Sequence, residues 1–238
     1  MRAYTAEQPF VFIHVPKCAG TSLKKVFKQW YRGSLKLHYF NEREKQMPER
    51  HLLEGGDCVF GHFTRVRGYG VYEYYPEPQQ IMSMFRDPFE VAQSRYWHTV
   101  KMIKSGKLFH NGTRIETFAE PNDWVAKASS NLDIHMPCPV NLTNYKDILD
   151  NHFIYIGIAE DMDWSLKIMA YILNKPVCEI PFLNTSPRED SLSITKEEHR
   201  NCDALNYAMY DHALSNHNAW KEKLQNDRPP FLPRAPFP

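Results

Sequence analysis

Residues 10–22 read Phe10-Val11-Phe12-Ile13-His14-Val15-Pro16-Lys17-Cys18-Ala19-Gly20-Thr21-Ser22. The apolar run from Phe10 to Val15 is continuous, which is typical of a strand covered on both faces in a parallel sheet. Leu23, Val26, Phe27 and Trp30 follow at helical spacing and predict a helix packed on that sheet. A strand, a tight turn and a helix start together favour a bound anion, because the helix dipole and the free backbone N–H groups attract negative charge.

The chemistry of this turn indicates a phosphate ligand. Gly20 allows close approach to the backbone, and Thr21 and Ser22 can cap the helix or donate to a phosphate oxygen. The turn differs from the P-loop of ATPases, in which the Lys follows the last Gly. Here Lys17 precedes Gly20 and no Gly opens the turn, so the cation is expected near the strand end.

A second segment has the same strand-to-turn-to-helix character. It reads Phe85-Arg86-Asp87-Pro88-Phe89-Glu90-Val91-Ala92-Gln93-Ser94-Arg95-Tyr96-Trp97. A strand is expected from Gln80 to Phe85, and a helix from Asp87 to about Lys104 with Pro88 in its first turn. Arg86 then lies at a strand end and Ser94 about two helical turns later. An Arg fork and a Ser hydroxyl suit a phosphate, although Arg86 alone would also fit a surface turn with a local ion pair.

Together the two segments resemble the phosphate sites of sulfotransferases that use 3′-phosphoadenosine 5′-phosphosulfate (PAPS), most closely the carbohydrate branch of heparan and uronyl 2-O-sulfotransferases. The resemblance implies that the 5′-phosphosulfate is held by Lys17, Cys18, Ala19, Gly20, Thr21 and Ser22. It also implies that Arg86 and Ser94 bind the 3′-phosphate and that Lys17 assists departure of the sulfuryl group. Residues 183–188 resemble a late loop that closes over the nucleotide, which adds Thr185 and Ser186 to the expected cofactor-binding residues. Cys18 departs from the family pattern, which more often has Thr.

The base is the least determined part of the expected site. A His suits proton transfer near neutral pH, and the chain has 11 of them. His62 is preferred, because it follows the expected strand at residues 57–60 and the resemblance implies a Gly-His base there. His14 is interpreted as a core residue inside the first strand, and His98 as structural or facing the acceptor. The remaining alternatives are His38, His51, Glu54 and Asp57.

Composition limits the class of protein. With 238 residues, of which 42% are hydrophobic, the chain can bury one core. We expect one domain at residues 1–225 and a Pro-rich tail at 226–238. The formal net charge of +1 gives no global field for nucleic acid. No run of about 18 apolar residues predicts a transmembrane segment. Five scattered cysteines indicate neither a disulfide framework nor a zinc site and favour the cytoplasm.

The order of the expected elements indicates the fold. A buried strand is expected at residues 153–158, followed by a helix carrying Met162, Leu166, Met169 and Leu173. A last helix is expected at residues 197–214. Residues 41–56 are interpreted as a solvated helix or loop, and 106–145 as irregular around a short helix near 117–128. Strands alternating with helices predict an α/β fold with a central parallel sheet in three layers, and the resemblance implies a P-loop-kinase-like sulfotransferase fold.

The expected function is transfer of the sulfuryl group from PAPS to an acceptor hydroxyl, on a carbohydrate or glycolipid, without a metal. Two alternatives stay open at this point. One is a nucleotide kinase-like phosphotransferase, and the other is a non-catalytic nucleotide- or glycan-binding module. The acceptor and the oligomeric state are not encoded in any motif of this sequence.

Overall fold

The computed structural model describes residues 4–41, 44–76, 80–110, 113–178 and 192–227, together with Pro229 and Phe231. Its centre is a parallel sheet of five strands in the order β2-β3-β1-β4-β7. These strands are β1 (Phe10–Ile13), β2 (Leu35–His38), β3 (Cys58–Gly61), β4 (Ile81–Phe85) and β7 (Phe153–Ile158). A short antiparallel pair, β5 (Phe109–His110) and β6 (Thr113–Arg114), lies apart from this sheet.

Helices connect the strands. The longer ones are α1 (Gly20–Trp30), α3 (Pro88–Lys104), α5 (Tyr145–His152), α6 (Met162–Ile172), α7 (Lys196–Cys202) and α8 (Ala204–Asp227). Shorter ones are α2 (Val71–Tyr74), α4 (Pro121–Val125), η1 (Arg65–Arg67), η2 (Asp133–His135) and η3 (Ala159–Asp161). Within the described ranges, no helix is both long and apolar enough to cross a membrane.

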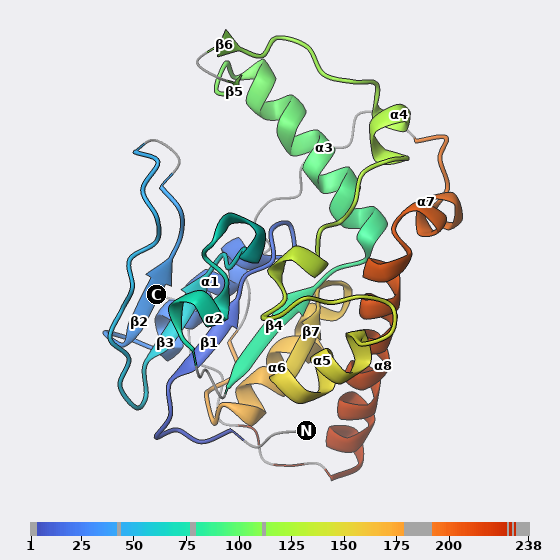
Figure 1. Cartoon of the computed structure of the whole chain (residues 1–238). Coiled ribbons are helices and arrows are strands. Elements are labelled where there is room, and N and C mark those ends of the chain that lie inside the picture. Colours follow the sequence, from blue (N-terminus) through green and yellow to red (C-terminus); the bar gives the residue numbers. More distant parts are fainter. Residues whose placement is uncertain are drawn as a thin grey trace.

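The sheet is buried between helices, as the continuous apolar runs predicted. On one face Phe27 of α1 packs against Phe12 and Phe60, with ring centroids 4.6 and 5.2 Å away. On the same face Met169 of α6 approaches Gly157 of β7. Figure 1 shows α2 and α5 in front of the sheet and α8 alongside β7. The predicted α/β fold with a central parallel sheet is therefore confirmed.

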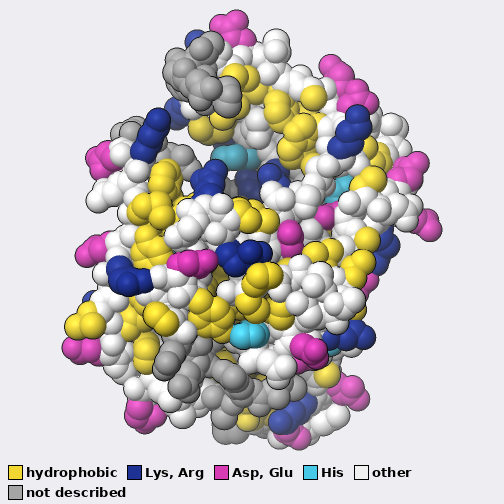
Figure 2. Space-filling model, in the orientation of Figure 1, with side chains coloured by type: hydrophobic (Ala, Val, Ile, Leu, Met, Phe, Trp, Pro, Cys, Tyr) yellow, Lys and Arg dark blue, Asp and Glu magenta, His cyan; other side chains and the backbone are white. Residues whose placement is uncertain are grey.

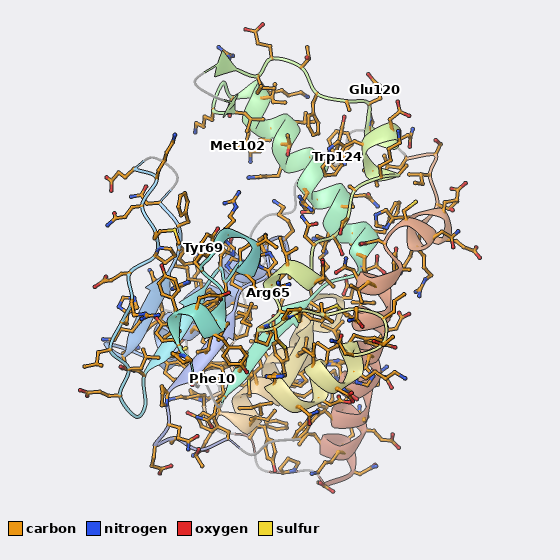
Figure 3. All side chains as sticks on the ribbon, viewed as in Figure 1. Phe10, Arg65, Tyr69, Met102, Glu120 and Trp124 are labelled. Atoms are coloured by element: carbon orange, nitrogen blue, oxygen red, sulfur yellow. The ribbon has the colours of Figure 1, made fainter. Side chains whose placement is uncertain are left out.

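One helix leaves this layered body. Figure 1 shows α3 extending away from the sheet, with the β5–β6 pair at its far end and α4 beside it. A separate small core joins α3 to α4, and Figure 3 shows Trp124 between the two helices. Tyr96 of α3 lies 5.9 Å from Trp124, centroid to centroid. This second core holds the outer half of α3 against the segment that follows it.

Several expectations need correction. Strand β2 and helix α5 lie in stretches for which no regular element was predicted. The expected last helix is two helices, because the chain breaks at Asp203. Its buried carboxylate accepts hydrogen bonds from Ser129 Oγ at 3.0 Å and Ser130 N at 2.8 Å. The second helix runs on to Asp227. Most of the predicted tail lies outside the described residues, although Phe231 packs against Tyr171.

Candidate active site

Three neighbouring strands bring the predicted site residues to one edge of the sheet. Strand β1 lies in the centre of the sheet order, with β3 on one side and β4 on the other. Lys17 follows β1, His62 follows β3 and Arg86 follows β4. Because all three strands are parallel, these residues share the carboxyl edge, where ligands bind in open α/β sheets. Residues 17, 62 and 86 thus share one edge of the sheet although their motifs are far apart in sequence.

The turn between β1 and α1, residues 14–19, has an unusual backbone. Lys17 and Ala19 adopt left-handed conformations, with φ of 69° and 59°. Such conformations cost about 1–3 kcal/mol each for non-Gly residues and concentrate at functional sites. The turn therefore holds a shape that a plain strand-to-helix connection does not require. Left-handed residues in a turn are also a component of the backbone concavities that bind anions.

Helix α1 begins without a side-chain cap. Its N-cap is Ala19, and no side chain accepts a hydrogen bond there, so the expectation that Thr21 or Ser22 caps the helix is wrong. Thr21 is exposed at the helix start, whereas Ser22 is buried. Ser22 N already donates to Ala19 O at 3.1 Å. The N–H groups that precede it in the first turn have no acceptor within their own helix. The end of α1 closest to Lys17 is therefore left positive.

Cys18 contributes to the core of the protein. Its side chain is fully buried in the main core, and burial raises the pKa of its thiol well above the ordinary range. Its backbone N–H donates to Val15 O at 3.3 Å. In this structure the thiol lies in the core and the N–H already has an acceptor, and the role of Cys18 in binding a phosphate stays a prediction.

Arg86 supports the turn from the adjacent strand. Its guanidinium donates to Lys17 O at 3.4 Å and to Glu90 Oε2 at 3.1 Å, and lies 3.8 Å from Glu160. Both carboxylates are partly exposed. The local ion pair expected for an isolated surface turn is thus present, together with a contact to the predicted phosphate turn. The 3′-phosphate role of Arg86 stays a prediction, as does that of Ser94, which is partly buried on α3.

Cations surround Lys17. Burial lowers the pKa of its ammonium, and the nearby charges of Arg86, Arg95 and Lys101 lower it further. His98, also on α3, has its pKa lowered by burial and then by Lys17 and Lys101. Figure 2 shows a hollow in this face of the molecule with Lys, Arg and His side chains on its walls. The concentration of positive charge favours binding of an anion here.

His62 has a defined tautomer. Its Nδ1 lies 2.7 Å from the carbonyl oxygen of His14, and because a carbonyl only accepts, Nδ1 carries the proton. Burial lowers the pKa of His62, although the hydrogen bond to His14 O acts in the opposite direction. Neutral His62 therefore has its lone pair on Nε2. This is the state that a general base requires.

Two other histidines lie beside His62. The ring of His14 stacks on it at 4.2 Å between centroids, and the ring of His135 lies 6.5 Å away. The interpretation of His14 as a core residue within the strand is wrong, because β1 ends at Ile13 and His14 is partly exposed. His135 donates from Nδ1 to Phe63 O at 2.7 Å, and burial lowers its pKa to about 4. Sequence reasoning missed His135, since nothing in its segment marks it.

The structure places the other candidate bases in different surroundings from His62. Glu54 and Asp57 precede β3 and so lie toward its amino end, opposite His62, where Asp57 accepts from the backbone N–H of Glu54. His38 is fully buried at the end of β2, with its ring stacked on Phe63. His51 contacts the carbonyl of Leu37 at 3.2 Å. Of these four alternatives, His38 lies directly beside His62, whose backbone N–H donates to His38 O at 2.9 Å, but its imidazole is buried in the core.

Residues 183–188, with Thr185 and Ser186, lie outside the described residues. The chain resumes at Leu192, which packs on the small core of α3 and α4 together with Ile194. Ser193 N donates to Asn122 Oδ1 of α4 at 2.8 Å. Residues 192–194 therefore lie against α3 and α4.

Comparison with known proteins gives a structural likeness but no sequence match. No family model matches the chain, and no curated protein matches it. The crystal structure of mouse sulfotransferase SULT7A1 complexed with PAP is similar, with 13% sequence identity and a TM-score of 0.41. The match covers 84% of this chain and 64% of that chain, so this chain spans less than two thirds of that protein. At this level of similarity the likeness says nothing about the ligands of this chain, and PAP is a ligand of the mouse protein alone.

Proposed function

We propose that this protein transfers the sulfuryl group of PAPS to a hydroxyl of a carbohydrate or glycolipid. The observation that carries the proposal is the position of Lys17, among Arg86, Arg95 and Lys101, at the same sheet edge as a neutral His62. The cations suit the phosphosulfate, and the histidine suits the acceptor. The two phosphate-site motifs, which have the order and context of a PAPS site, support the identity of the donor.

The proposed reaction is a direct transfer. His62 Nε2 takes the proton of the acceptor hydroxyl as the acceptor oxygen attacks sulfur. The bond between sulfur and the bridging phosphate oxygen breaks, and its electron pair leaves with adenosine 3′,5′-bisphosphate. The Lys17 ammonium donates a hydrogen bond to that oxygen as negative charge develops on it. A donor positioned for such charge contributes on the order of 3 kcal/mol to the rate. The products are the sulfate ester and the bisphosphate.

Nucleotide binding is the first test. Adenosine 3′,5′-bisphosphate should raise the melting temperature well above the value that the same concentration of AMP gives, because stabilisation grows with ligand affinity. Equal shifts with the two nucleotides would contradict a 3′-phosphate site.

Transfer is the second test. Incubation with PAPS labelled with ³⁵S and a panel of glycans, glycolipids and small alcohols should place label on at least one hydroxyl acceptor. Transfer that requires ATP and magnesium would instead identify a phosphotransferase. Tight binding of the bisphosphate without label on any member of the panel would favour a binding module.

A further inference from the structure

The ring of His14 fills the space between the predicted phosphate turn and the predicted base. On one side it stacks on His62 at 4.2 Å, with 28° between the ring planes. On the other side it lies directly against Gly20. A Cβ placed on Gly20 would be 1.6 Å from His14 Nε2. The imidazole of His14 therefore occupies the volume that any side chain at position 20 would need.

Hydrogen bonds fix the residue in this place, and its backbone N–H donates to Gly61 O at 2.7 Å. His14 Nδ1 is 3.1 Å from the hydroxyl of Tyr39, which follows β2. The carbonyl of His14 accepts from His62 Nδ1. Tyr39 also meets His62 edge-on at 4.9 Å, and the ammonium of Lys24 lies 4.6 Å from the centre of the Tyr39 ring. The side chain of His14 is thus held by β2, β3 and the start of α1 together.

We propose that His14 is a positioning residue that couples the turn at residues 14–19 to His62, and that position 20 is Gly because the His14 ring packs there. The contact between the His14 ring and Gly20 does not depend on the proposed function. The effect of His14 on turnover, through the position of His62, rests on the proposed function. The groups that face His14 are His62, His135, Lys24 and Tyr39. No carboxylate is among them in the described structure, and burial together with the three basic groups lowers the pKa of His14, so that a neutral ring separates the turn from the base.

The competing explanation for Gly20 is close approach of a ligand to the backbone, and the two can be separated without any activity. The backbone of Gly20 is helical and at negative φ, so alanine has no conformational penalty there and is the better helix former by roughly 1 kcal/mol. The Cβ of an alanine at position 20 has no room, however, while the His14 ring is present. If the ring is removed, the Cβ has room again.

The test is a cycle of four proteins: wild type, Gly20→Ala, His14→Ala and the double variant, compared by urea and thermal unfolding. Gly20→Ala should lower the melting temperature in the wild-type background and leave it unchanged or raise it in the His14→Ala background. Equal losses in both backgrounds would overturn the packing relation. Affinity for adenosine 3′,5′-bisphosphate is measured on the same four proteins. If Gly20→Ala weakened nucleotide binding equally in the wild-type and His14→Ala backgrounds, close approach of the nucleotide to the backbone would explain the glycine, and the His14 ring would not.

The positioning role is tested with His14→Ala and His14→Phe. Phenylalanine keeps a ring between Gly20 and His62 but has no nitrogen. We expect His14→Ala to lower kcat by roughly tenfold or more, with KM for PAPS changed less than threefold, and His14→Phe to recover most of the loss. The NMR titration of His62 should shift in the alanine variant and return toward its wild-type position in the phenylalanine variant. A phenylalanine variant as slow as the alanine variant would overturn positioning and indicate a role for the imidazole nitrogens. If the wild-type protein transferred no sulfuryl group at all, the proposed function would fail while the stability cycle and the titration still decided the role of His14.

Discussion

At the scale of single residues, the site depends on which nitrogen of His62 is free. The carbonyl of His14 fixes the proton on Nδ1, and burial favours the neutral ring. A histidine held in this state keeps Nε2 unprotonated in neutral solution. In the proposed reaction, the choice of Nε2 as the proton acceptor and the pH range follow from this hydrogen bond and its surroundings.

His62→Ala should therefore lower kcat by a factor on the order of 10²–10⁴, because the acceptor hydroxyl loses its proposed base. Affinity for adenosine 3′,5′-bisphosphate, measured by calorimetry, should stay close to that of the wild type. His212→Ala is the matched control, since His212 pairs with Asp150 on α5 and lies away from the site. Full activity of the His62 variant would assign the base to another residue.

The pH dependence of transfer follows from the direction of the His62 shift. A base whose pKa lies below its ordinary value of about 6.5 is still unprotonated when the solution is brought to that pH. The acid limb of the kcat profile should therefore be centred below pH 6.5. A limb centred at or above that value would contradict a buried neutral His62.

Arg86→Ala is expected to weaken binding of adenosine 3′,5′-bisphosphate by about tenfold or more, because a charged hydrogen bond is lost and the turn also loses its contact at Lys17 O. Arg200→Ala is the control, since that guanidinium forms an exposed ion pair with Asp211 at 2.6 Å. Calorimetry at fixed ionic strength compares the two variants. Equal affinities would remove Arg86 from the nucleotide site.

At the scale of elements, the start of α3 is the joint that holds the extended helix to the sheet. Asp87 is its N-cap and accepts from Phe89 N at 3.0 Å and Glu90 N at 3.3 Å. The same carboxylate contacts the ammonium of Lys196 at the start of α7. Pro88 lies at the first helical position, as the sequence predicted. One buried side chain thus begins α3 and ties it to α7.

Asp87→Ala should lower the free energy of unfolding by about 1–2 kcal/mol, because the cap is lost and Lys196 is left without its partner. Urea denaturation measures this. Asp163→Ala is the control, since Asp163 is exposed and pairs with Lys167 one turn along α6, a contact expected to contribute about 0.5 kcal/mol or less. Losses of the same size in the two variants would contradict the role of Asp87 as the joint.

At the scale of the whole molecule, buried neutral histidines link stability to pH. His38 is fully buried among aromatic rings, with its ring stacked on Phe63 and edge-on to Tyr74. Burial lowers its pKa to about 4. Between this value and about 6.5 the unfolded chain binds a proton that the folded chain excludes, so stability falls as the pH is lowered through that range.

His38→Leu, which is close to His in volume, should remove part of this dependence. The loss of unfolding free energy between pH 6.5 and 4 should be smaller in the variant by up to about 3 kcal/mol, whatever its stability at pH 7. Urea titrations at several pH values compare the two proteins. His212→Leu serves as the control, because His212 lies on α8 and contacts Asp150 and Tyr145 instead of the rings around His38. An unchanged pH dependence in the His38 variant would show that His38 gains its proton without unfolding.

The buried strands were predictable because their apolar runs are continuous. Residues 153–158 form β7 with the predicted bounds, and the predicted strand at residues 80–85 is β4 apart from its first residue. Strand β2 was not predictable in the same way, because Leu35 to His38 alternate with a Lys and lie at the sheet edge, where one side of the strand is open. The break at Asp203 was hidden because its partners, Ser129 and Ser130, are distant in sequence.

The sequence by itself determined the α/β fold, the turn with Lys17 and the positions of His62 and Arg86 at strand ends, since each depends on local hydrophobic pattern and turn chemistry. Only the tertiary structure decided that β1 lies between β3 and β4, and that His14 and His135 join His62. Strand order and ring contacts depend on pairing between segments far apart in the chain, for which local pattern carries no information. His14 illustrates the difference: one residue beyond the end of β1, it lies between Gly20 and the predicted base instead of in the core.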